Sequence, residues 1–246
     1  MQSIIAVVLI IVTAGLILIL SLPQFSRKRI FRPIAGLQRL NKAIGLAVEN
    51  GTRIHVALGN GSVNQTDFAA SLAGLATLER IAQISSVSDR PPLATVGNGP
   101  LAFLAQSTLR AAYRRSHAME LYDPDRAQLA GVTPYSYTAG VLPIADSELV
   151  STHILNGNFG PEIALLVEEA NSAGAFTLAS TDSLSGQAAL YAAAEEPLLG
   201  EEVFALPAYL KAGPVHHASL AVQDLLRWGI ILVLLGGSVL KFLGIL

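Results

Sequence analysis

Two uncharged apolar runs, one at each end of the chain, constrain its fold more than any other feature. Ile4 to Leu22 contains no charged residue, and Trp228 to Leu246 is interrupted only by Lys241. Each run is 19 residues long. A helix of that length rises about 28 Å, close to the roughly 30 Å hydrocarbon core of a bilayer. We therefore expect residues 1–22 and residues 225–246 to form two transmembrane helices.

A cleavable signal peptide is the alternative interpretation of the first run. However, residues 1–3 carry no positively charged side chain, the apolar run exceeds the usual length of such a peptide, and no A-x-A cleavage site follows it. These features favour a permanent anchor.

Glycines recur in the second run at spacings of seven or eight residues. They are Gly229, Gly236, Gly237 and Gly244. This spacing places small residues on one face of a helix, where a second helix can approach closely. The alternative is that glycine is simply frequent in membrane helices. We expect a helix-packing face.

Basic residues predict the orientation of the two spans. Five of them are expected at the membrane interface: Arg27, Lys28, Arg29, Arg32 and Arg227. Arg39 and Lys42 extend the basic stretch, so we assign residues 23–42 to a basic juxtamembrane segment. Because basic residues flank membrane spans on the cytoplasmic side, we expect the middle of the chain in the cytoplasm and both termini outside the cell inner membrane.

Composition excludes several classes of protein. Charged residues make up 14% of the chain, against about 25% in soluble domains. The chain has no cysteine, which excludes a disulfide framework, a thiolate metal site and a cysteine nucleophile. Residues 43–224 hold 18 acidic and 8 basic side chains. Such an acidic segment would repel a phosphate backbone, so we expect no nucleic acid partner.

Residues 43–224 are predicted to form a cytoplasmic α/β domain. Apolar residues between Ile34 and Val48 recur every three or four positions, which indicates an amphipathic helix. Six short apolar runs then alternate with helical stretches; they are residues 54–58, 93–96, 127–132, 149–155, 176–179 and 198–199. Parallel strands need crossover connections, so this alternation predicts a doubly wound, mostly parallel, Rossmann-like sheet. A (β/α)8 barrel would need two more such units.

The loops that follow the strands are the predicted place for a ligand, because the carboxyl ends of parallel strands lie at one edge of a sheet. The candidate ligand-binding residues are Asn60, Asn98, Asn158 and Tyr137. Gly-Asn-Gly occurs at residues 59–61 and 97–99, but neither copy completes the G-x-G-x-x-G dinucleotide fingerprint. Tight turns between strand and helix explain both copies, and we expect no cofactor.

Three carboxylates are weak candidates for catalysis. Glu162, together with Glu201 or Glu202, would form an acid/base pair at the strand ends. The alternative for Glu162 is that the dipole at the start of a helix stabilises its charge. The five histidines show no ligand spacing, so no metal site is expected, and His55 and His153 lie in predicted strands where they would satisfy local hydrogen bonds.

A set of short motifs resembles a known family. The motifs are Ala43-Ile44 with Val48-Glu49, Gly51 and His55, then Tyr137-Thr138-Ala139-Gly140, Gly157-x-Phe159-Gly160-x-Glu162, Gly200-Glu201-Glu202 and Gln223-Asp224. Together they resemble an uncharacterised bacterial family of membrane-anchored proteins catalogued only as a domain of unknown function. The resemblance covers about Arg32 to Arg227. It implies a membrane anchor and an α/β domain, and it implies no activity.

Two hypotheses on function follow. The first is a structural or accessory membrane protein that associates with itself, as a homo-oligomer, or with other membrane-protein subunits within the lipid bilayer. The second is a membrane-tethered enzyme or small-molecule-binding module that uses the strand-end loops. The sequence names no substrate, partner or copy number.

Overall fold

The computed structural model describes residues 2–22, 31–65, 68–86 and 88–243 of the chain, which divides into two compact units. The two chain ends, Met1–Phe31 and Gly213–Leu246, make up one unit, and Arg32–Ala212 makes up the other. The described part of the first unit is dominated by two long helices, and the second unit is an α/β domain.

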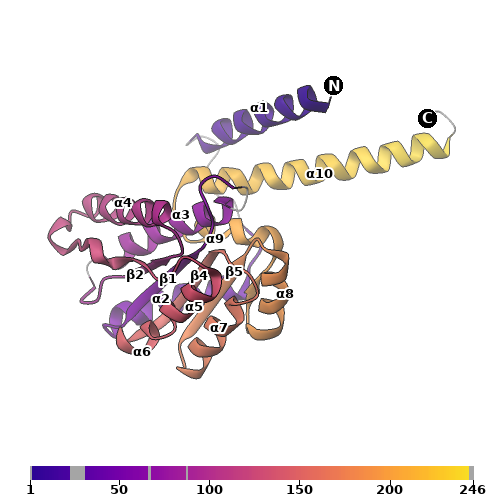
Figure 1. The fold of residues 1–246 in the computed structure, drawn as a ribbon. Coiled ribbons are helices and arrows are strands. Elements are labelled where there is room, and N and C mark those ends of the chain that lie inside the picture. The colour runs from indigo at the N-terminus through magenta and orange to yellow at the C-terminus, as the bar shows by residue number, and fades with distance from the viewer. Residues whose placement is uncertain (1, 23–30, 66–67, 87, 244–246) are drawn as a thin grey trace. The chain divides into compact units, whose positions relative to one another are not determined.

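The terminal unit contains two apolar helices (Figure 1). α1 spans Gln2–Ser21, α10 spans Pro214–Phe242, and the two helices contact each other. The 18 residues Ile4–Ser21 have a mean hydropathy of 3.1, and the most apolar window of α10 has a mean hydropathy of 1.8. None of either window is buried. Both helices are therefore long and apolar enough to span a membrane.

α10 is longer than the second apolar run. It begins at Pro214, whose fixed φ suits the first turn of a helix, and it continues without a break for 29 residues. The segment 214–227 and residues 228–242 of the second apolar run thus form a single helix of about 44 Å.

Six strands form one sheet in the α/β unit. They are β1 (Arg53–Gly59), β2 (Leu93–Val96), β3 (Ala127–Leu129), β4 (Val150–Asn158), β5 (Phe176–Thr181) and β6 (Pro197–Leu198). Their spatial order is β3-β2-β1-β4-β5-β6, and each neighbouring pair is parallel. This is the strand order of a doubly wound Rossmann-like sheet. The predicted fold class is confirmed.

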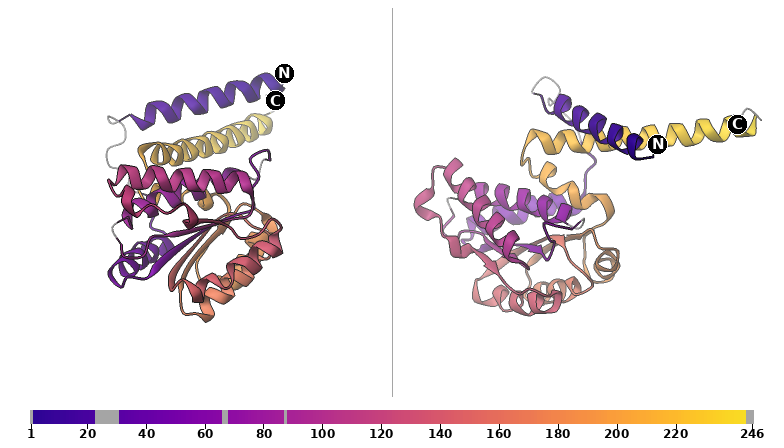
Figure 2. Two further views of the ribbon diagram at one scale, coloured as in Figure 1. Left: turned by 60° about the vertical axis from the view of Figure 1, so that its left-hand side comes forward. Right: turned by 45° about the horizontal axis from the view of Figure 1, so that its top comes forward.

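Helices cover both faces of the sheet, as Figure 2 shows. One face packs against α2 (Ala35–Glu49), α3 (Phe68–Ile84), α4 (Gly99–Arg115) and α9 (Leu206–Tyr209). The other face packs against α5 (Pro134–Val141), α7 (Ile163–Ser172) and α8 (Leu184–Ala193). The remaining elements are α6 (Ile144–Ser147), η1 (Met119–Leu121), η2 (Pro124–Arg126) and η3 (Gly200–Phe204).

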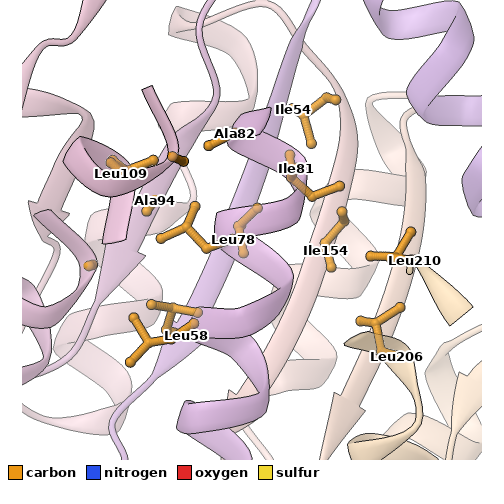
Figure 3. Close-up of a cluster of buried hydrophobic side chains, with 14 of the residues drawn as sticks. Ile54, Leu58, Leu78, Ile81, Ala82, Ala94, Leu109, Ile154, Leu206 and Leu210 are labelled. Atoms are coloured by element: carbon orange, nitrogen blue, oxygen red, sulfur yellow. The ribbon is translucent and has the colours of Figure 1, made fainter. Parts of the chain in front are cut away.

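The larger core cluster lies between α3 and the sheet (Figure 3). Leu78 and Ile81 of α3 are fully buried, as is Leu58 of β1. The cluster also includes Ile54, Ala82, Ala94, Leu109, Ile154, Leu206 and Leu210. Alternate residues of a strand point to opposite faces of a sheet. Ile54 and Leu58 therefore fill this core, whereas His55 and Ala57 point to the face covered by α5 and α7.

The connection between β3 and β4 contains two short helices. They are α5 and α6. Thr133 and Ser136 form a reciprocal capping box at the start of α5, and Pro134 occupies its first turn. Eight residues make only about two helical turns, which is too short for a clear hydrophobic period. This short helix nevertheless positions Tyr137 against the sheet.

Candidate functional site

The direction of winding reverses between β1 and β4. From β1 the chain proceeds outward to β2 and β3, and from β4 it proceeds outward to β5 and β6. In open α/β sheets, ligands bind beside the carboxyl ends of the strands at this switch point. The carboxyl ends of β1, β2 and β4 meet here. Asn60 and Asn98 lie in the loops after β1 and β2, and Asn158 is the last residue of β4.

The structure brings the three predicted asparagines together. The Asn60 backbone N–H donates to the Asn158 carbonyl at 2.9 Å, so the β1 and β4 loops are joined directly. The Asn98 side-chain amide donates to the Gly61 carbonyl at 2.6 Å and to the Asn60 carbonyl at 3.4 Å. Asn98 thereby ties the β2 loop to the β1 loop.

The side chains of Asn98 and Asn158 also stabilise the conformation of the loops. Asn98 Oδ1 accepts from the Leu101 backbone N–H at 2.9 Å and caps α4. Asn158 Nδ2 donates to Asp182 Oδ1 at 2.9 Å, which connects the β4 loop to the β5 loop. The side-chain amides of Asn98 and Asn158, two of the groups that the sequence suggests for a ligand, therefore bind neighbouring loops. Their ligand-binding role stays a prediction.

Close packing explains why glycines stand in these loops. A Cβ on Gly59 would overlap the backbone oxygen of Asn158, and a Cβ on Gly97 would overlap Asn60 Oδ1. Gly59 also has a φ of 67°, which favours glycine. Both needs are structural, in agreement with the interpretation of the Gly-Asn-Gly motifs as tight turns.

The three candidate carboxylates have different surroundings. Glu162 precedes α7 and is only 6% exposed, and its Oε1 accepts from the Gly160 backbone N–H at 2.7 Å. This carboxylate folds back onto its own loop. Glu202 lies in η3 and pairs with Arg32, while Glu201 of the same 3-10 helix is exposed. Nothing in these contacts joins the carboxylates into an acid/base pair, and that role stays a prediction.

Tyr137 is 1% exposed and belongs to a buried polar chain across the sheet. Its hydroxyl lies 2.7 Å from Thr95 Oγ1, which lies 2.8 Å from Nε2 of His55. Nδ1 of His55 lies 3.1 Å from Nδ1 of His153. At this distance one ring donates and the other accepts, so the pair needs at least one unprotonated Nδ1.

Burial determines the protonation state of the two histidines and of Tyr137. It lowers the pKa of His153 to about 4. Burial, together with the adjacent His153 ring, lowers the pKa of His55 well below its usual value. Burial raises the pKa of Tyr137 above its usual value. All three side chains are therefore neutral near pH 7.

Sequence reasoning missed the histidine pair. It expects each histidine to satisfy a separate local hydrogen bond, but the two rings bond to each other. They are opposite one another in the register of β1 and β4. A sequence separation of 98 residues hides this pairing, and only knowledge that β1 neighbours β4 would have revealed it.

The structure describes some, but not all, of the residues predicted at the membrane interface and on the helix-packing face. Arg32 pairs with Glu202, and Arg227 lies 3.5 Å from Asp224 on α10. A Cβ on Gly229, Gly236 or Gly237 would meet no atom of the described residues within 4 Å. Arg27, Lys28, Arg29 and Gly244 lie outside the described residues.

The fold and its switch point define a doubly wound α/β protein that carries two helices able to span a membrane. The chain belongs to the family described as Domain of unknown function (DUF6754), and the match covers residues 1–246. The predicted resemblance to a family of unknown function is thus confirmed, and the match includes both terminal helices. Searches of curated proteins and of solved structures found no match to this chain.

Proposed function

We propose that this chain is an integral protein of the cell inner membrane that acts as a structural or accessory component. In this proposal the two apolar helices anchor a cytoplasmic α/β domain, and the protein works by associating with copies of itself or with other membrane-protein subunits.

The outward-facing side chains of α1 carry this proposal. Ile4 and Leu18 each expose 69% of their surface, and large aliphatic residues between them are exposed on several sides of the helix. Burying one such side chain stabilises a protein by about 1.5–3 kcal/mol. A helix of this composition is therefore unfavourable in water, and a bilayer supplies the apolar surroundings that it needs.

Basic residues support the cytoplasmic placement of the domain. The Arg32 side chain is 75% exposed although it pairs with Glu202. Arg227 is also exposed, near the start of the second apolar run. Arginines at these positions favour the cytoplasmic side of a span.

The glycines of α10 support association between helices. The space beside Gly236 and Gly237 is open in a single chain. Small residues allow the backbones of two membrane helices to approach closely. We assign this face to contact with a second copy of α10.

Native mass spectrometry of the full chain, extracted from its own membranes in mild detergent, tests association. We expect a multiple of 25.8 kDa or a larger mixed complex. Gly236→Leu should reduce the size of a homo-oligomer. Ser238→Leu is the matched control, because two residues along a helix correspond to about 200° of rotation. A monomer without partner subunits, or an equal effect of both variants, would contradict the proposal.

Cysteine labelling tests the orientation, because the natural chain has no cysteine. Glu120→Cys places a thiol at an exposed position of the α/β domain. A membrane-impermeant maleimide should label it only after cell lysis. Ser3→Cys, near the predicted outer end of α1, should react in intact cells. The reverse pattern would place the domain outside.

A second candidate function is a small-molecule-binding module or enzyme at the strand-end loops. The switch point between β1 and β4, with three asparagines beside it, favours this possibility. It predicts a single chain that retains a stoichiometric small molecule during native mass spectrometry, and Asn98→Ala should abolish that retention.

A further inference from the structure

The outward-facing side of α4 combines one large apolar side chain with two arginines. Phe103, Ser107, Arg110 and Arg114 follow one another at spacings of four, three and four residues, so they form one stripe along the helix surface. All four residues are exposed, and Phe103 exposes 75% of its surface. The residues on the other side of α4 are buried in the core; they are Leu101, Ala105, Leu109 and Ala112. α4 is therefore an amphipathic helix with an aromatic and basic outer stripe.

The two arginines of this stripe are free to bind an outside partner. The side chains of Arg110 and Arg114 form no hydrogen bond or ion pair with the residues that the structure describes. By contrast, Arg115 of the same helix pairs with Glu79 of α3. The negative carboxyl end of α4 stabilises Arg114 in its last turn. It explains neither Arg110, one turn earlier, nor the exposure of Phe103.

The charge around this stripe is opposite in sign to that of the domain as a whole. Residues 43–224 hold 18 acidic and 8 basic side chains. Residues 90–119, which include all of α4, hold four arginines and no acidic residue. α7, which covers the opposite face of the sheet, carries Glu168 and Glu169 and no basic residue. An anionic surface would therefore be attracted to α4 and repelled by other parts of the domain.

We propose that the outward face of α4 binds the anionic headgroups of the membrane in which the chain is anchored. The inference rests on the proposed function, because the cytoplasmic surface of a membrane is the negatively charged one. In this arrangement Arg110 and Arg114 bind lipid phosphates and Phe103 inserts among the headgroups. Basic and aromatic side chains are combined in this way on helices that lie at a membrane interface.

The attachment of the α/β unit favours a lipid surface over an acidic protein. Both ends of the unit, Arg32 and Ala212, continue into the unit that contains the two apolar helices. If those helices span a bilayer, the domain is tethered to it at a high effective concentration. A weak contact is then sufficient, whereas an acidic protein would have to bind from solution.

The full chain in lipid nanodiscs tests this contact. Because the natural chain has no cysteine, Ser107→Cys places a single fluorophore within the stripe. Ser172→Cys is the matched control, at the exposed end of α7 on the opposite face of the sheet. Lipids with a spin-labelled headgroup quench a fluorophore close to the bilayer. We expect strong quenching at Ser107→Cys in nanodiscs that contain phosphatidylserine, weak quenching in phosphatidylcholine alone, and little quenching at Ser172→Cys in either.

Substitution of the arginines measures their share of the contact. Arg110→Gln should lower the ratio of bound to unbound domain about 5-fold, and Arg110→Gln/Arg114→Gln about 30-fold. Arg39→Gln is the matched control, because it removes the same charge from an exposed arginine of α2 that pairs with Glu195 and Glu196. It should leave the ratio unchanged. Circular dichroism checks that each variant is folded.

The charged and apolar parts of the stripe should respond differently to salt. Salt screens the attraction between arginines and anionic headgroups, so the effect of Arg110→Gln should decrease as the ionic strength rises. Phe103→Ala should weaken the contact at every salt concentration, because the burial of apolar surface does not depend on charge.

Three results with nanodiscs would overturn the proposal. They are equal quenching in the two lipid compositions, equal quenching at Ser107→Cys and Ser172→Cys, and an equal effect of Arg110→Gln and Arg39→Gln. Binding of hexaglutamate through Arg110 in detergent, without any quenching that depends on lipid charge, would identify an acidic protein as the partner and would also overturn it.

Failure of the proposed anchoring gives a different result. A chain that does not enter nanodiscs would refute the membrane anchor and this inference together. A chain that enters nanodiscs without quenching at Ser107→Cys would refute this inference alone, so the two failures are distinguishable.

Discussion

Acidification should weaken the centre of the sheet through the His55–His153 pair. The two rings lie side by side on β1 and β4, both are at most 4% exposed, and their Nδ1 atoms are 3.1 Å apart. Protonating the accepting Nδ1 would remove this hydrogen bond and leave a charge in the core.

The magnitude follows from proton linkage. His153 takes up its proton near pH 4 in the folded chain, against 6.5 for an ordinary histidine. Between these values the unfolded chain binds more protons, so the free energy of unfolding falls as the pH falls. From pH 6.5 to about pH 5, His153 alone should remove about 2 kcal/mol of stability. Because the pKa of His55 is also lowered, the pair together should remove more stability than His153 alone.

Hydrogen–deuterium exchange of the full chain in mild detergent measures this change. Slow amides of β1 and β4 report the free energy of opening of the sheet. After correction for the pH dependence of chemical exchange, the opening free energy of these amides should decrease by at least about 2 kcal/mol between pH 6.5 and pH 5. Replacing both rings in His55→Leu/His153→Leu removes both partners of the hydrogen bond, a change that is often nearly neutral.

Two results would refute this reasoning. Unchanged protection of β1 and β4 across this pH range would show that the rings do not titrate as their burial requires. An equal loss of protection in the double variant would assign the pH dependence to other groups, such as carboxylates.

Two further predictions concern a glycine of β4 and the buried arginine. Gly157→Ala should destabilise the domain by about 2–4 kcal/mol, because the new Cβ would overlap a backbone oxygen of β1. Gly99→Ala, where a Cβ meets nothing within 4 Å, should stay within about 0.5 kcal/mol of the natural chain in thermal unfolding. Glu148→Gln should cost about 2 kcal/mol, because Arg53 is buried and its Nη2 lies 3.1 Å from Glu148 Oε2. A cost below about 0.5 kcal/mol would mean that the hydrogen bond from Arg53 to the Pro91 carbonyl is enough to stabilise the buried guanidinium without Glu148.

The sequence pattern predicts β4 to end too early. The pattern predicts a strand over residues 149–155, because the polar sequence Asn156-Gly157-Asn158 is typical of a loop. The structure continues the strand to Asn158. Asn156 is fully buried; its side chain donates to Thr77 Oγ1 of α3 and accepts from Ser180 of β5. Partners on other elements therefore satisfy a residue that looks like part of a turn.

In the candidate site, too, the sequence predicted some features and the tertiary structure decided others. Convergence of Asn60, Asn98 and Asn158 was predictable, because the ends of parallel strands lie at one edge of a sheet. That the side chains of Asn98 and Asn158 bind neighbouring loops, and that Glu162 folds onto Gly160, depends on loop conformation. The sequence pattern does not contain this information.

By itself, the sequence determined the two apolar helices and the alternation of strands with helices. Both depend on composition and periodicity over roughly 20 residues, which can be read locally. Only the tertiary structure decided the strand order and the contact between His55 and His153. Each of these depends on which distant segments pack against one another, and the residues involved carry no local pattern that records their partners.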